Sequence, residues 1–113
     1  MFEKLELTRM AQALASHSGA RLGTVAQNIA HADTPGYRAR DLPDFGAAYA
    51  AWDDPASHRP RALPGATDPN GNSVRLQDQM TTMARIRQDH DMALAIQRST
   101  SSVLRAALGR GGA

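Results

Sequence analysis

The sequence predicts an all-α fold in which two long amphipathic helices at the chain ends pair as a hairpin resembling a coiled coil. Two observations predict it. Apolar residues recur every three or four positions in residues 1–33 and again in residues 73–113, and all six prolines lie between these segments. The chain therefore divides into an N-terminal helix (1–33), a Pro-rich, irregular insert (34–72), and a C-terminal helix with a frayed tail (73–113).

The first helical segment contains no proline, and Thr34-Pro35-Gly36 is expected to end it. Gly19 and Gly23 each cost a helix about 1 kcal/mol relative to alanine, so its middle is expected to be soft or closely packed against a neighbour. One polar residue, Ser18, interrupts its apolar stripe. The apolar members are predicted to form a helix-packing interface: Leu7, Met10, Leu14, Leu22, Val25 and Ile29.

The last helical segment has an apolar spacing close to 3.5 residues, which is typical of coiled coils. Asn72 is its predicted N-cap, and Gly109, Gly111 and Gly112 are expected to end it. Polar residues at inward positions, such as Gln97, would trade stability for register and choice of partner. The apolar members complete the predicted packing interface: Leu76, Met80, Met83, Ile86, Leu94, Leu104 and Leu108.

The insert predicts regular structure only in short pieces. Residues 45–52 are expected to form one or two helical turns, and Asp68-Pro69-Asn70-Gly71 is typical of a turn. The remainder is expected to be an extended, partly ordered arm that becomes paired on assembly.

The composition predicts a marginally stable, partly disordered monomer. The 113 residues allow one domain, and alanine supplies 21 of them, whereas Leu, Ile, Val and Phe together number 18. This share lies below the roughly 20% at which ordinary domains begin to lose a packed core. Partners are therefore expected to complete the folding.

Charge and cysteine content narrow the function classes. Arginine supplies 12 of the 13 basic residues, which keeps a small basic helical nucleic-acid-binding protein open as an alternative. The absence of cysteine excludes disulfides and thiolate metal sites. The N-terminus lacks the apolar run of a secretory signal, and no segment approaches the ~20 apolar residues of a membrane span, so the residues alone predict a cytoplasmic protein.

Candidate catalytic and metal-binding residues form no recognisable pattern. The spacing of the four histidines (His17, His31, His58, His90) matches no metal motif, and no serine lies in a nucleophile-elbow motif. Two aspartate pairs, Asp41/Asp44 and Asp53/Asp54, fall in the insert without an evident pocket. The sequence therefore predicts no enzyme, no cofactor and no small-molecule substrate.

Residues 28–37 read Asn-Ile-Ala-His-Ala-Asp-Thr-Pro-Gly-Tyr, and they resemble the N-terminal signature of flagellar rod, hook and hook-associated proteins. Residues 38–45 narrow the resemblance to the proximal-rod members of the flagellar basal-body rod family. Residues 71–80 are similar to the start of that family's C-terminal helix. Three features depart from its usual pattern: His31 replaces an asparagine, Arg75 replaces an acid, and the 39-residue insert is short. The motif residues are Asn28, Ala30, Asp33, Thr34, Pro35, Gly36, Tyr37, Arg40 and Asp41.

The motif also has a physical interpretation. Pro35 and Gly36 would stop the helix, while Asn28, Asp33 and Thr34 would cap or bond the freed backbone. The turn would thereby set the direction in which the arm leaves.

The resemblance implies a structural subunit of the proximal rod, part of the drive shaft for flagellum-dependent motility, that polymerises through its terminal helices. Implied partners are copies of itself, other rod subunits, the rod–ring adaptor and the export gate. The implied location is the periplasmic rod of the basal body, reached by flagellar type III export without a cleaved signal peptide. Another rod subunit of the same family is the nearest alternative.

Overall fold

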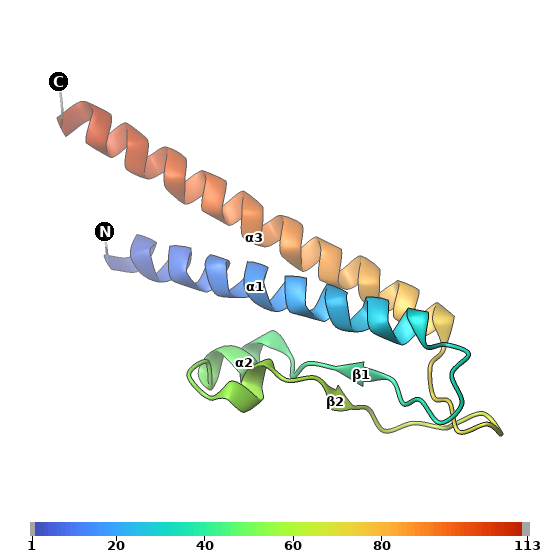
Figure 1. Ribbon diagram of the computed structural model, residues 1–113. Helices are drawn as coiled ribbons and strands as arrows, with labels where there is room; N and C mark the ends of the chain where they lie inside the picture. The colour runs from blue at the N-terminus through green and yellow to red at the C-terminus, as the bar shows by residue number, and fades with distance from the viewer. Residues whose placement is uncertain (1, 112–113) are drawn as a thin grey trace.

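The computed structural model describes residues 2–111 as a mostly helical, elongated molecule of 69 × 26 × 15 Å (Figure 1). The elements follow the order α1 (Phe2–Ala30), β1 (Arg40–Asp41), α2 (Phe45–Ala50), the 3₁₀ helix η1 (Pro55–His58), β2 (Arg61–Ala62) and α3 (Leu76–Gly111). The two long terminal helices are confirmed. The expectation of an all-α fold is wrong in one respect, because β1 and β2 form a small sheet.

Helix α1 is the middle layer of the molecule. It runs antiparallel to α3, with the start of α1 and the end of α3 at the same end of the molecule, and the arm (residues 38–66) folds back along its other side (Figure 1). Helix α1 contacts α3, β1 and α2. It therefore buries two faces, whereas α3 packs mainly against one neighbour.

Small side chains dominate the interface between the long helices. In α3 the buried positions recur every seven residues, at Gln79, Ile86, Ala93 and Thr100. In α1 the residues Ala11, Ser18 and Val25 are buried at the same interval. Because most of these side chains are small, each buries little area and contributes little hydrophobic free energy.

Buried hydroxyl groups in the helices bond to their own backbone. Ser18 Oγ donates to the Leu14 carbonyl at 2.7 Å, and Thr100 Oγ1 donates to the Ile96 carbonyl at 3.0 Å. Thr24 repeats this pattern with the carbonyl of Ala20 at 3.1 Å. Within residues 2–111, the interface therefore contains polar residues without leaving a buried side-chain nitrogen or oxygen unpaired.

The predicted packing residues separate into three groups. Leu14, Val25 and Ile86 are buried, whereas Leu22, Ile29, Met83 and Leu104 are half-buried. The other six are exposed within the single chain, so their packing against helices of other subunits stays a prediction. On α3, the face through residues 79, 86, 93 and 100 is turned toward α1, and the predicted stripe follows one flank of that face. The six exposed residues are Leu7, Met10, Leu76, Met80, Leu94 and Leu108.

The arm is paired within the single chain, contrary to the expectation that it pairs on assembly. Strands β1 and β2 are antiparallel, with Arg40 opposite Ala62 and Asp41 opposite Arg61. Ala39, Leu42 and Ala48 are buried as the arm follows α1. Helix α2 confirms the helical turns expected in residues 45–52.

Both long helices end differently from the prediction. Helix α1 ends at Ala30, before residue 33. The His31 amide is shared between the carbonyls of Gln27 and Asn28, and the Ala32 amide donates three residues back to the Ile29 carbonyl at 3.2 Å. Helix α3 begins at Leu76, so Asn72 is not its N-cap. It also continues through Gly109, since one glycine costs a helix only about 1 kcal/mol. Gly112 and the end of the predicted frayed tail lie outside the described residues.

None of the helices in residues 2–111 is both long enough and apolar enough to cross a membrane.

Gly23, inside helix α1, and Gly36, in the turn after it, should respond in opposite ways to replacement by alanine. A Cβ at Gly23 would meet nothing within 4 Å, so Gly23→Ala should raise the free energy of unfolding by about 0.5–1 kcal/mol. Gly36 has φ of 77°, so Gly36→Ala should lower it by roughly 1–2 kcal/mol. Thermal unfolding followed by circular dichroism measures both changes. A lower stability of Gly23→Ala would contradict the open environment at this position.

Candidate functional site

The motif residues gather where α1 ends, the arm departs and α3 approaches (Figure 1). At its centre, Asn28 is fully buried on the last turn of α1. Its Oδ1 accepts from the Arg40 amide at 3.1 Å and from the Tyr37 hydroxyl at 3.0 Å. Its Nδ2 donates to the Arg40 carbonyl at 2.8 Å and to Gln79 Oε1 at 2.9 Å.

These four bonds use both donors and both acceptor sites of the Asn28 amide. The pair with the backbone of Arg40 imitates a neighbouring strand, so β1 has a hydrogen-bonding partner on each edge. The bond to Gln79 ties the same amide to α3. One side chain therefore joins α1, the arm and α3.

Asn72 bonds to the turn that follows α1 (residues 31–37). Its Nδ2 donates to the carbonyls of His31 and Thr34 at 2.9 and 2.8 Å, and its Oδ1 accepts from the Val74 amide at 2.7 Å. Asn72 therefore caps the carbonyl groups freed beyond the end of α1, which the sequence had assigned to Asn28, Asp33 and Thr34.

Two glycines let the chain segments on either side of the turn approach closely. Gly36 and Gly71 both have positive φ, at 77° and 84°. A Cβ on Gly71 would lie 3.3 Å from Gly36 Cα, and the Gly36 amide donates to the Asn70 carbonyl at 2.9 Å. A side chain at Gly71 would therefore push these segments apart and strain the backbone.

An ion pair fixes the start of the arm to α1. Arg21 Nε and Nη2 donate to Asp41 Oδ1 and Oδ2 at 2.9 and 2.8 Å, and both side chains are largely shielded from solvent. These hydrogen bonds raise the pKa of Arg21 above its ordinary value, more than burial lowers it. Asp41 Oδ1 also accepts from the Leu42 amide at 2.8 Å, so Asp41 is a structural anchor.

His31 has specific contacts in the turn that follows α1. Its ring stacks on Tyr37 with centroids 4.7 Å apart and planes 15° apart. Its Nδ1 lies 3.1 Å from Thr34 Oγ1. The stack holds Tyr37 beside α1, where its hydroxyl reaches Asn28.

The far end of the arm is anchored through aromatic contacts. His17 is buried in α1 and its Nε2 donates to the Pro43 carbonyl at 2.8 Å. The same ring packs edge-on against Phe45, which stacks on Tyr49. Trp52 joins this group and contacts His58, whose Nε2 donates to the Trp52 carbonyl at 2.8 Å.

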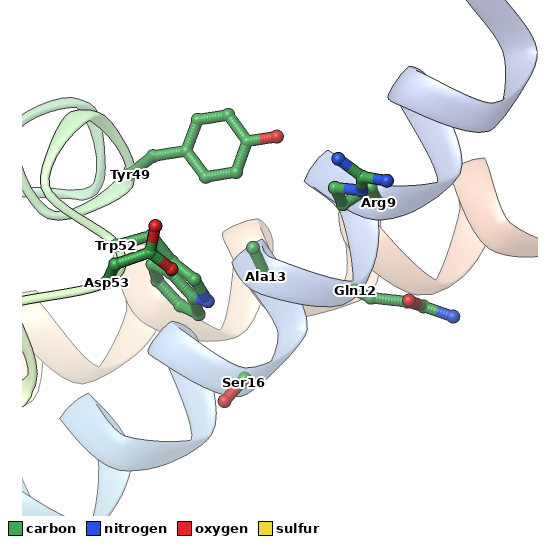
Figure 2. A pocket seen from close by; sticks show the side chains of 7 residues that line it. All are labelled: Arg9, Gln12, Ala13, Ser16, Tyr49, Trp52 and Asp53. Atoms are coloured by element: carbon green, nitrogen blue, oxygen red, sulfur yellow. The ribbon is translucent and has the colours of Figure 1, made fainter. Parts of the chain in front are cut away.

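A groove of about 500 Å³ lies between these aromatic residues and the N-terminal half of α1 (Figure 2). Figure 2 shows Tyr49 and Trp52 along one wall, with the Tyr49 ring extending toward Arg9 on α1 and Asp53 beside Trp52. We call this feature the arm groove. The expectation that Asp53 lacks a neighbouring pocket is wrong, because the fold brings α1 against a segment distant in sequence.

The histidines and acids do not converge on one point. In the part of the chain that the structure describes, no group of three His, Asp or Glu side chains is arranged to hold a metal ion. Three histidines contact backbone or hydroxyl groups as described above, and His90 lies half-buried on α3.

The structure assigns different roles to the predicted motif residues. Asn28, Gly36, Tyr37 and Asp41 make the contacts described, whereas Arg40 contributes its backbone. Ala30, Asp33 and Pro35 are exposed, and the side chain of Asp33 makes no hydrogen bond within residues 2–111. Sequence reasoning missed Arg21, His17 and Gln79, since each pairs with a residue at least 20 positions away.

No protein-family model matches this chain, and no curated protein matches it. The resemblance carried by residues 28–45 and 71–80 therefore stays a prediction.

The Asn28 amide should dominate the stability of the turn. Asn28→Ala removes four hydrogen bonds and leaves the amide and carbonyl of Arg40 without these partners. The free energy of unfolding should fall by roughly 2–4 kcal/mol, measured by urea denaturation. The exposed neighbour is the control, with Gln27→Ala expected to change stability by less than about 0.5 kcal/mol. Equal effects would contradict the role assigned to Asn28.

The geometry of the Arg21–Asp41 pair is also testable. Arg21→Lys keeps the charge but cannot form the paired bonds, so it should lower stability by about 1 kcal/mol. The pKa of Arg21 is higher in the folded chain than its ordinary value. The contribution of the charged Arg21 to the free energy of unfolding is therefore complete at pH values below the ordinary arginine pKa, and it is lost only at pH values above that pKa. The difference between the two proteins should therefore stay constant from about pH 5 to about pH 9. A difference that vanished within this range would contradict the assignment.

Proposed function

We propose that this chain is a structural subunit of the bacterial flagellar basal-body rod, of the proximal-rod (FlgB) type, and that its role is assembly rather than catalysis. The resemblance of residues 28–45 and 71–80 suggests this family. The proposed partners are copies of the chain, other rod subunits, the rod–ring adaptor and the export gate. The proposed location is the periplasmic rod, reached by flagellar type III export without a cleaved signal peptide.

The observation that carries the proposal is the apolar surface left uncovered on both long helices. Near the N-terminus of α1, Phe2 and Leu5 are 80% and 57% exposed, and on α3 Met80 and Leu108 are 67% and 70% exposed. Extended apolar surface on a monomer is typical of protein–protein interfaces. A wall of neighbouring helices would cover it, with coiled-coil-like packing of the terminal helices.

The motif turn supports the same proposal through its rigidity. Asn28 and Asn72 satisfy the backbone groups on both sides of the turn, and Arg21 anchors the arm to α1. A subunit of a helical assembly must present its surfaces at fixed angles, since small angular errors accumulate along a non-closing array.

The test is association with the neighbouring rod subunits. Sedimentation and circular dichroism, alone and in mixtures, should show helicity and thermal stability rising as complexes form. If the chain did not bind those subunits but bound DNA with a steep salt dependence, the proposal would be overturned in favour of the nucleic-acid alternative.

A matched pair of variants tests whether this association uses the exposed apolar stripe of α3 that contains Met80. Met80→Glu places a charge on the apolar flank of α3 and should weaken association by about tenfold. Gln88→Glu adds the same charge on another exposed side of α3 and should have little effect. Equal effects would show that the stripe around Met80 is not the contact surface.

A further inference from the structure

The arm groove and the C-terminal half of α3 have complementary chemistry. The groove has two half-buried aromatic side chains, Tyr49 and Trp52, with the carboxylate of Asp53 beside them (Figure 2). Aromatic faces next to a carboxylate suit a guanidinium group, which can stack and form an ion pair at once. The groove also contains a guanidinium of its own, but Arg9 Nη1 lies 3.7 Å from Glu6 Oε1, which partly offsets its charge.

An uncovered ridge on α3 provides such groups. The exposed side chains of Leu94, Arg98, Ser101, Ser102 and Arg105 lie along one side of α3. We call this feature the α3 ridge. Leu94 is 37% exposed, and both arginines are exposed.

The charges of the two chain segments are opposite. Residues 92–113 contain three arginines and no acidic residue, whereas residues 42–54 contain three aspartates and no lysine or arginine. Within one chain, α1 lies between α3 and the α2 end of the arm, so the aromatic side of the groove is separated from the ridge (Figure 1). The two surfaces come together only at an edge, where Gln12 and Ser101 line a common hollow. The ridge of one copy and the groove of another have no such barrier.

We propose that the α3 ridge of one copy docks in the arm groove of a second copy, with Arg98 or Arg105 stacked on Trp52 and paired with Asp53. The contact joins two different surfaces, so it is heterologous and leaves a free ridge and a free groove on every pair. Repetition of the contact gives an open array when the rotation between successive copies does not close a ring. The inference rests on the proposed function, because it identifies one contact through which such an array grows.

Cysteine cross-linking tests the contact directly, because the chain has no cysteine of its own. Ser16→Cys places a thiol at the groove, and Ser102→Cys places one on the ridge. Mixed under oxidising conditions, these two variants should give about tenfold more mixed disulfide than Ser16→Cys mixed with Thr81→Cys. Thr81 is exposed on α3, about 30 Å along the helix from Ser102. Equal yields from the two mixtures would overturn the contact.

A charge exchange tests the paired groups. Asp53→Arg should weaken self-association, measured by sedimentation, by roughly tenfold, and adding Arg98→Asp and Arg105→Asp should recover most of the loss. The control Asp68→Arg makes the same charge change elsewhere in the exposed insert and should alter association by less than about twofold. A triple variant no tighter than Asp53→Arg alone would overturn the pairing.

The two proposals fail in different ways. Loss of the Ser16–Ser102 cross-link, with binding to other rod subunits retained, would overturn the ridge-and-groove contact alone. A chain that cross-links as expected but binds no rod subunit would overturn the rod assignment and leave a self-associating protein.

Discussion

The structure depends on one buried amide. Asn28 bonds to both backbone groups of Arg40, to the hydroxyl of Tyr37 and to the amide of Gln79. With few large apolar residues, the chain has little hydrophobic free energy with which to select one arrangement of helices and arm. A fully bonded polar group adds this selectivity, because alternative packings would leave it buried without partners.

The layer order follows from the same shortage of apolar side chains. Helix α1 is covered on one side by α3 and on the other by the arm, so its small residues contribute burial on two faces. Helix α3 has one such neighbour over most of its length and retains exposed Met80, Leu94 and Leu108.

The arm has a structural and a chemical role. Arg21, Asn28 and His17 attach it along the length of α1, which makes it a continuous layer of the single chain. This attachment places Tyr49, Trp52 and Asp53 against α1 and creates a groove that no single element contains. The acidic and aromatic side chains of this groove lie on the opposite side of α1 from the arginine-rich end of α3. This separation favours contact between two chains over contact within one chain.

The sequence by itself determined the two long helices, the short helix near residue 45 and the sharp turn after α1, because helical periodicity, proline positions and glycine turns act locally. It also identified Asn28, Tyr37 and Gly36 through the motif. Only the tertiary structure decided which side of each helix is buried. On α3, the exposed stripe through Leu76 and Met80 and the buried stripe through Gln79 and Ile86 are offset by one position, so helical periodicity alone does not tell them apart. The pairing of Arg21 with Asp41, the capping role of Asn72 and the arm groove likewise join residues far apart in the chain, and periodicity contains no information about such contacts.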